Sequence, residues 1–193
     1  PYEENQKFFH DWRAAGVEKI FLRPNDQHLA TGLPMGFEKA MFDAYKLGIE
    51  NGIIGTDYDS LYNFWPVYGM GDYILAKAHV DPSKSFEYWE EEYCSAYGAA
   101  APEVKAYFAY WRDAICKKKI LPAMPKILKQ LNGNNLFRTG IFRDNLHDYY
   151  SPEDFDRTDL ILSKGASKKL NERQKNLIEQ LVLSNQHARL THQ

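Results

Sequence analysis

The hydrophobic pattern of the first third of the chain alternates between two periods. Apolar residues between 4 and 15 recur at spacings that place them on one side of a helix, and residues 36–50 repeat this pattern. A short apolar run follows each helical segment, at 17–22 and at 52–57, and each run is bordered by Gly or Pro. Short apolar runs between helices are typical of buried parallel strands. The pattern therefore predicts a helix–strand–helix–strand unit of the α/β class.

After residue 60 the pattern becomes helical. Helices are expected at about 62–78, 86–97, from 101 onward, 151–165 and 171–190. Pro122 and Pro125 are expected to kink or end the third of these helices, because proline lacks the backbone N–H. Ser151, followed by a proline and two acidic residues, is typical of a helix start. Residues 132–148 are rich in Asn and Gly and are expected to form a loop.

These patterns predict a helix-rich α/β fold in two parts. Two strand–helix units cannot close a barrel, since a complete (β/α)8 barrel needs about 250 residues. Residues 1–60 are therefore interpreted as the last βα units of an incomplete (β/α)8 barrel. Residues 61–193 are then an α-helical C-terminal region packed on those units.

Composition and charge exclude several classes of protein. Lys and Arg number 24 against 26 Asp and Glu, a net charge of −2, which is too balanced for binding nucleic acid through its phosphates. No apolar run approaches 18 residues, so no membrane span is expected. Cys94 and Cys116 fit no metal or disulfide spacing and are expected to be unpaired and partly buried. The six histidines form no zinc motif, so neither a metal nor a cofactor is predicted.

The beginning of the chain carries no visible signal peptide, because it has neither a basic start nor an apolar run. Pro1 stands where an initiator Met is expected. We therefore expect the chain to be a processed or trimmed piece of a longer protein.

Polar and aromatic side chains follow both predicted strands and form the candidate binding site. In chain order they are Arg23, Asn25, Asp26, His28, Asp57, Asp59 and Trp65. In parallel α/β folds, ligands bind at the carboxyl ends of the strands. Charged and amide groups can pair with sugar hydroxyls, and an aromatic ring can cover the C–H face of the sugar. The alternative for residues 23–26 is a turn in which Asn and Asp bond their own backbone.

Asp57 and Asp59 are the best carboxylate pair in the sequence. In an extended chain their Cα atoms would lie about 6.5–7 Å apart on one face. Glycosidases use two carboxyls about 5–5.5 Å apart when retaining and about 6.5–9.5 Å apart when inverting. Any Asp-x-Asp on a strand gives this spacing, however, and glycosidase pairs usually come from different strands. The pair therefore indicates ligand contact more than catalysis.

Residues 52–113 contain several motifs of a known family. They comprise the Gly-apolar-apolar-Gly stretch at 52–55, an aromatic-rich helix at 62–77, Asp81-Pro82, and Tyr97-Gly98-x-Ala100. Together they resemble bacterial glycoside-hydrolase-like proteins that carry a large domain of unknown function after a TIM barrel. Alpha-glucuronidases and beta-hexosaminidases share this architecture. The family's Trp before Asp-Pro is Val80 here, and the first Tyr of its Tyr-Tyr-Gly motif is Ala96.

The resemblance implies a carbohydrate-active protein, secreted or periplasmic, whose last barrel strands and helical domain lie in this chain. Its catalytic carboxylates would lie on earlier strands, so this chain would form one wall of a carbohydrate site together with the remainder of a longer chain. One alternative is a non-catalytic helical scaffold or interaction module, with Trp65, Trp89 and Trp111 at its interface. A second alternative, a self-standing enzyme, lacks a complete catalytic constellation in the sequence.

Overall fold

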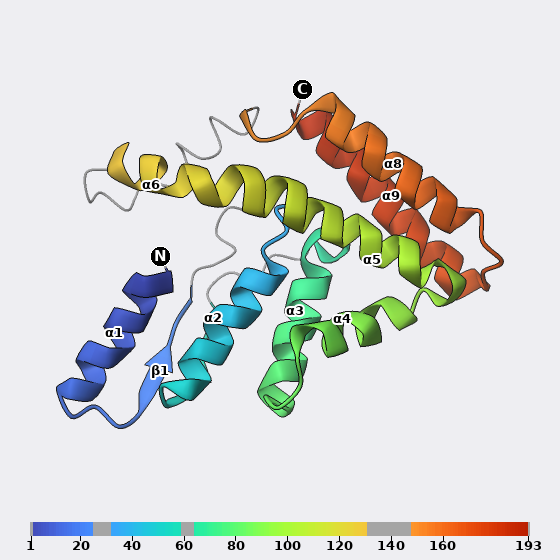
Figure 1. Cartoon of the computed structure of the whole chain (residues 1–193). Coiled ribbons are helices and arrows are strands. Elements are labelled where there is room, and N and C mark those ends of the chain that lie inside the picture. The colour runs from blue at the N-terminus through green and yellow to red at the C-terminus, as the bar shows by residue number, and fades with distance from the viewer. Residues whose placement is uncertain (1, 25–31, 59–63, 131–147, 193) are drawn as a thin grey trace.

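Two short parallel strands and the helices beside them form one end of the molecule (Figure 1). The computed structural model describes residues 2–24, 32–58, 64–130 and 148–192. The first elements in chain order are α1 (Tyr2–Ala14), β1 (Ile20–Leu22), α2 (Glu38–Glu50) and β2 (Ile53–Thr56). The predicted alternation of helix and strand is confirmed, with strands shorter than the apolar runs that predicted them.

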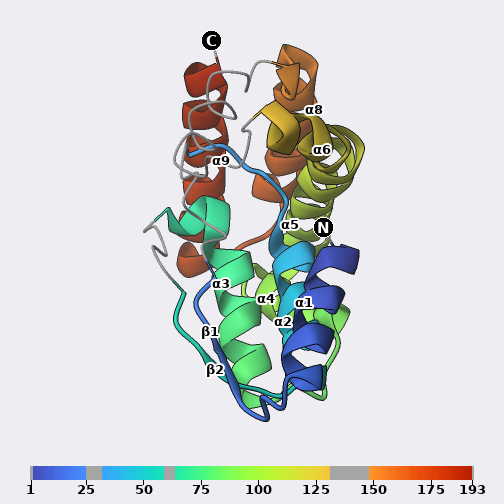
Figure 2. The same ribbon diagram turned by 90° about the vertical axis from the view of Figure 1, so that its left-hand side faces the viewer.

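The two strands form an open sheet in the part of the chain that the structure describes. Their parallel register pairs Ile20 with Ile53 and Leu22 with Thr56, with an irregularity after the first pair. Ile20 and Ile53 are buried against the helices. Figure 2 shows the strands along an outer edge of the molecule, with α2 and α3 on one side of them. The helix-rich α/β class is confirmed, and this sheet is not closed into a barrel.

A long continuous helix connects the two ends of the molecule. The helices α3 (Trp65–Val80) and α4 (Phe86–Ser95) and the short 3-10 turn η1 (Gly98–Ala100) lead into it. It consists of α5 (Ala101–Tyr110), the π-helical segment η2 (Trp111–Ile120) and α6 (Leu121–Gln130), as Figure 1 shows. Figure 1 also places α6 toward the end of the molecule that holds α1.

The helix does not end at Pro122 or Pro125 but continues to Gln130, so the expected end at these prolines is wrong. The backbone N–H of Leu121 donates to the carbonyl of Cys116, which is the five-residue spacing of a π-helix. Pro122 follows directly, so the residue without an N–H stands where five-residue spacing returns to four-residue spacing. A missing donor is tolerated more easily there than within a regular α-helix, where each N–H has an assigned acceptor.

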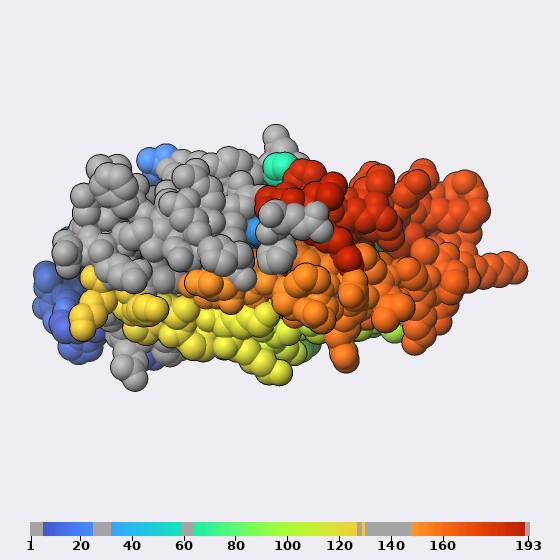
Figure 3. Space-filling model, turned by 90° about the horizontal axis from the view of Figure 1, so that it is seen from above, coloured from blue at the N-terminus to red at the C-terminus, as the bar shows by residue number. Residues whose placement is uncertain are grey.

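Two antiparallel helices, α8 (Pro152–Ala166) and α9 (Glu172–His192), pack together at the opposite end from α1 (Figure 3). Ser151 begins α8 as predicted. Its backbone N–H donates to the Asp154 carboxylate at 2.8 Å, and the two side chains complete a capping box. Helix α8 also packs against α5, which joins the pair to the rest of the molecule.

The buried side chains form one continuous core on both sides of residue 60. Its centre is Trp111, which is fully buried and has the Phe155 ring 5.4 Å and the Tyr150 ring 6.0 Å away. The hydroxyl of Tyr150 donates to the carbonyl of Pro34 at 3.2 Å. This hydrogen bond holds the segment before α2 against the C-terminal part of the chain. The two strands pack on the same core through Ile20 and Ile53.

Candidate functional site

The carboxyl ends of the two strands lie side by side, and an ion pair joins them. The backbone N–H of Asp57 donates to the carbonyl of Leu22 at 2.8 Å, so strand pairing continues one residue past β2. Nε of Arg23 lies 3.4 Å from Oδ2 of Asp57. The structure thus brings together one predicted site residue from each strand.

This ion pair is open to solvent. The side chains of Arg23 and Asp57 are 62% and 61% exposed. An exposed ion pair of this kind contributes only about 0–1 kcal/mol to stability, because water competes for both charges. The fold therefore depends little on the pair, and its charged groups are accessible to a ligand that offers hydroxyls.

The sheet face beside the ion pair is apolar and exposed. Phe21 is 63% exposed and Ile54 is 65% exposed. The Phe21 ring lies over Gly55, where a Cβ atom would meet it at 3.0 Å. Side chains two residues apart on a strand point to the same side, so Arg23 and Phe21 share this face. We call Phe21 and Ile54 the exposed sheet face.

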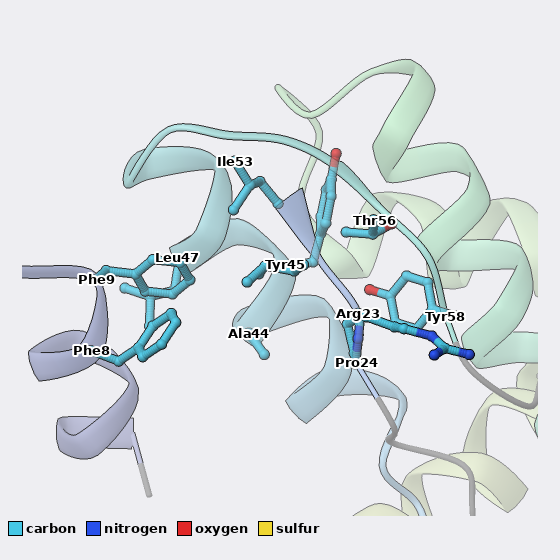
Figure 4. Close-up of a pocket in the computed structure, with 11 residues that line it drawn as sticks. Phe8, Phe9, Arg23, Pro24, Ala44, Tyr45, Leu47, Ile53, Thr56 and Tyr58 are labelled. Carbon is cyan, nitrogen blue, oxygen red and sulfur yellow. The ribbon is translucent and has the colours of Figure 1, made fainter. Parts of the chain in front are cut away.

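A cavity of about 310 Å³ lies between α1, α2 and the two strands (Figure 4). Its wall is mostly apolar. Figure 4 shows Phe8 and Phe9 of α1 on one side, and Arg23 beside Tyr58 on the other. The volume is at the lower end of the range of about 300–1,000 Å³ for small-molecule pockets. The cavity therefore has room for one small ligand next to the strand ends.

His79 holds the polar part of this cavity wall in place, and no sequence motif points to it. Its Nδ1 lies 2.7 Å from the carbonyl oxygen of Leu75 and its Nε2 lies 2.7 Å from Oγ1 of Thr56. A carbonyl oxygen only accepts, so Nδ1 carries the hydrogen, and in the neutral ring Nε2 accepts from the Thr56 hydroxyl. The ring also stacks on Tyr45, with centroids 4.2 Å apart. These contacts fix two residues that line the cavity.

The other predicted site residues near the strand ends are not placed. Asn25, Asp26, His28 and Asp59 lie outside the described residues. The capped-turn alternative for residues 23–26 and the pairing of Asp59 with Asp57 therefore stay predictions.

Trp65 does not belong to the strand-end cavity. It is the first residue of α3, is 47% exposed, and lines a different hollow together with Tyr97 and Arg173. In the sequence Trp65 follows Asp57 by only eight residues, which is why it falls among the predicted strand-end residues. The start of α3 carries its side chain to the hollow beside α4 and α9 instead.

Two of the three tryptophans proposed for a scaffold interface are buried. Trp89 is 6% exposed and Trp111 is fully buried. Lys77 covers the Trp89 ring, with Nζ 5.3 Å from its centroid, while Trp111 packs inside the aromatic core. The interface prediction is therefore wrong for both residues, and only Trp65 of the three is accessible.

The remaining chemistry-bearing groups offer no metal centre in the described ranges. There, no cluster of three or more His, Cys, Asp or Glu is arranged to hold a metal ion. Cys94 and Cys116 are unpaired and buried, as predicted, and burial raises the pKa of each thiol to about 12. Within the same ranges, no helix is long and apolar enough to cross a membrane.

The strand ends combine hydrogen-bond donors and acceptors beside apolar surface. The Arg23 guanidinium supplies donors and the Asp57 carboxylate supplies acceptors, which a sugar hydroxyl needs together. Compared with known proteins, the chain matches no family, no curated protein and no solved structure. The function is therefore inferred from this geometry and chemistry.

Proposed function

We propose that this chain is the C-terminal part of a carbohydrate-active, glycoside-hydrolase-like protein that acts on a polysaccharide or glycan. The two strands are the last strands of its barrel, and residues 61–193 form a helical domain packed on them. The observation that carries this proposal is the Arg23–Asp57 ion pair beside the exposed sheet face.

The exposed sheet face supports a larger sheet in the complete protein. Parallel sheets are almost always covered on both faces, and a two-stranded sheet alone is marginally stable. Phe21 and Ile54 are instead more than 60% exposed, on the face away from the buried Ile20 and Ile53. Large apolar side chains of this kind fill the inside of a (β/α)8 barrel. Further strands would give them that environment.

In this proposal the strand ends bind sugar but do not supply the catalytic pair. Hydrolysis of a glycosidic bond needs two carboxyl groups on either side of it. Asp57 forms an ion pair with Arg23, which suits it to accept hydrogen bonds from sugar hydroxyls. The catalytic carboxylates are then on strands that precede this chain. A polysaccharide substrate also supports a secreted or periplasmic location.

The proposal predicts a loss of sugar affinity when the strand-end charges are removed. In the full-length protein, Arg23→Ala and Asp57→Ala should each weaken binding of an oligosaccharide at least tenfold. Hydrogen bonds to charged groups contribute about 1.5–3 kcal/mol, and about 1.4 kcal/mol corresponds to a factor of ten. A glycan array identifies the oligosaccharide, and isothermal titration calorimetry measures its affinity.

A second exposed ion pair provides the matched control. Lys117 and Asp113 lie 2.7 Å apart on η2, and their side chains are 58% and 55% exposed. Lys117→Ala and Asp113→Ala remove the same charges away from the strand ends and should leave sugar affinity unchanged. Unchanged affinity in both Arg23→Ala and Asp57→Ala would remove the strand ends from the site. Absence of any bound glycan would favour the scaffold alternative.

A further inference from the structure

A second hollow, separate from the strand ends, is lined by residues of α3, of α4 and its C-terminal end, and of the start of α9. Its volume is about 200 Å³. Its lining consists of Trp65, Tyr73, Glu92, Tyr93, Tyr97 and Arg173, completed by Ala96 and Leu177. It is smaller than the pockets of about 300–1,000 Å³ that hold drug-sized ligands, so it suits a single ring.

The Trp65 ring, which lines this hollow, is held in place by close packing. A Cβ atom at Gly69, one helical turn further along α3, would lie only 2.5 Å from the ring. The indole therefore packs directly on the helix backbone at Gly69, while 47% of the residue stays exposed. A flat aromatic surface fixed in this way can stack against a ring without first losing rotamer freedom.

The acceptor in the hollow is also fixed before any ligand binds. Oε1 of Glu92 accepts from the Tyr73 hydroxyl at 2.5 Å and lies 2.6 Å from Nζ of Lys77. These contacts lower the pKa of Glu92, the Lys77 hydrogen bond most, so the carboxylate stays charged near neutral pH. The Tyr93 ring, which also lines the hollow, packs 5.6 Å from that of Tyr73.

Arg173 supplies the donor. It lies in the first turn of α9, is exposed, and makes no hydrogen bond or ion pair with any residue in the described ranges. The adjacent acid, Glu172, is 2.6 Å from Lys175 instead. Arg173 therefore lines the hollow with its five N–H donors available, and the Glu92 carboxylate that lines it too is already paired with Lys77.

We propose that this hollow is a second carbohydrate-binding site, which holds one pyranose ring of a glycan chain. The ring stacks on Trp65, and its hydroxyls donate to Glu92 and accept from Arg173. The choice of a sugar as ligand rests on the proposed function. The hollow and the residues that line it are observed independently of that function. Trp12 offers a contrast, because it is equally exposed at 48% but the described residues that line its hollow all belong to α1 or directly follow it.

The test uses the full-length protein and a hexasaccharide chosen from the glycan array. The indole N–H signal of Trp65, identified by its loss in Trp65→Phe, should shift during an NMR titration, and that of Trp12 should not. Trp65→Ala and Arg173→Ala should weaken binding at this site at least tenfold. Trp65→Phe keeps a ring and should retain most of the affinity.

Matched variants separate this site from the strand ends. Trp12→Ala removes an equally exposed indole, and Lys175→Ala removes a charge from the turn of α9 that holds Arg173. Both variants should bind the hexasaccharide at the second site with unchanged affinity. Arg23→Ala should not affect the Trp65 titration. A bound hexasaccharide that leaves the Trp65 signal unmoved, or Trp65→Ala with normal affinity, would overturn the second site alone. If no glycan binds at all, the proposed function fails and the second site fails with it.

Discussion

Gly36→Ala is expected to destabilise the protein by about 3 kcal/mol or more, the sum of backbone strain and overpacking. Gly36 has φ of +69°, a conformation that side chains rarely adopt. An added Cβ would lie 2.4 Å from the backbone nitrogen of Arg112, at the start of η2. Backbone atoms inside a helix cannot rotate away. Leu33 and Met35 before Gly36 and Glu38 after it are buried, so the loop cannot move aside.

The variant Gly16→Ala distinguishes the cost of backbone strain from the cost of overpacking. Gly16 has φ of +89°, but nothing lies within 4 Å of an added Cβ. Gly16→Ala should therefore cost only the strain of the left-handed backbone, about 1–2 kcal/mol. Urea unfolding followed by tryptophan fluorescence measures both variants. Equal losses for Gly36→Ala and Gly16→Ala would contradict the close approach of the loop to η2.

Glu38→Gln is expected to stabilise the protein at pH 8 by up to about 3 kcal/mol and to have little effect near pH 4. Glu38 is 6% exposed, and burial raises its pKa to about 7, against an ordinary value of 4.5. The Arg112 guanidinium lowers this pKa, but that group lies 2.8 Å from Glu90 and is bonded to it. Burial therefore outweighs the nearby positive charge.

Stability decreases with rising pH because the folded protein keeps the Glu38 carboxyl proton to a higher pH than the unfolded chain does. Between pH 4.5 and about 7 the unfolded chain has lost the Glu38 proton and the folded protein has not. The free energy of unfolding of the wild type therefore falls as the pH rises through this range. Glu38→Gln has no carboxyl at this position, so it does not lose this stability. Urea unfolding of the wild type and of Glu38→Gln at a series of pH values measures this pH dependence. ¹³C NMR measures the Glu38 pKa directly. Titration of Glu38 near 4.5 would contradict the account.

The helices and strands of the first third could be predicted because local pattern and burial agree there. Gly16 and Gly52 both take positive φ and stop the helices where the sequence indicates. The continuation of the long helix past Pro122 could not be predicted, because the helix-breaking effect of proline assumes hydrogen bonds of four-residue spacing. The π segment before Pro122 changes that spacing, and no single residue type announces it.

The candidate site was predictable only where residues follow a strand directly. Arg23 and Asp57 meet because parallel strands end at the same edge. Trp89 and Trp111 look like interface residues in the sequence, since periodicity does not distinguish a face turned to the core from one turned to a partner. His79 acts through contacts to elements far along the chain, and a lone histidine carries no signal of them.

The most direct test of the central claim is a crystal structure of the full-length protein soaked with an oligosaccharide. In that structure, further parallel strands are expected to continue the β1–β2 sheet and to cover Phe21 and Ile54. A sugar hydroxyl is also expected within hydrogen-bond distance of Arg23 or Asp57. A structure in which that sheet face stays open to solvent, or in which the sugar binds away from both strand ends, would contradict the claim.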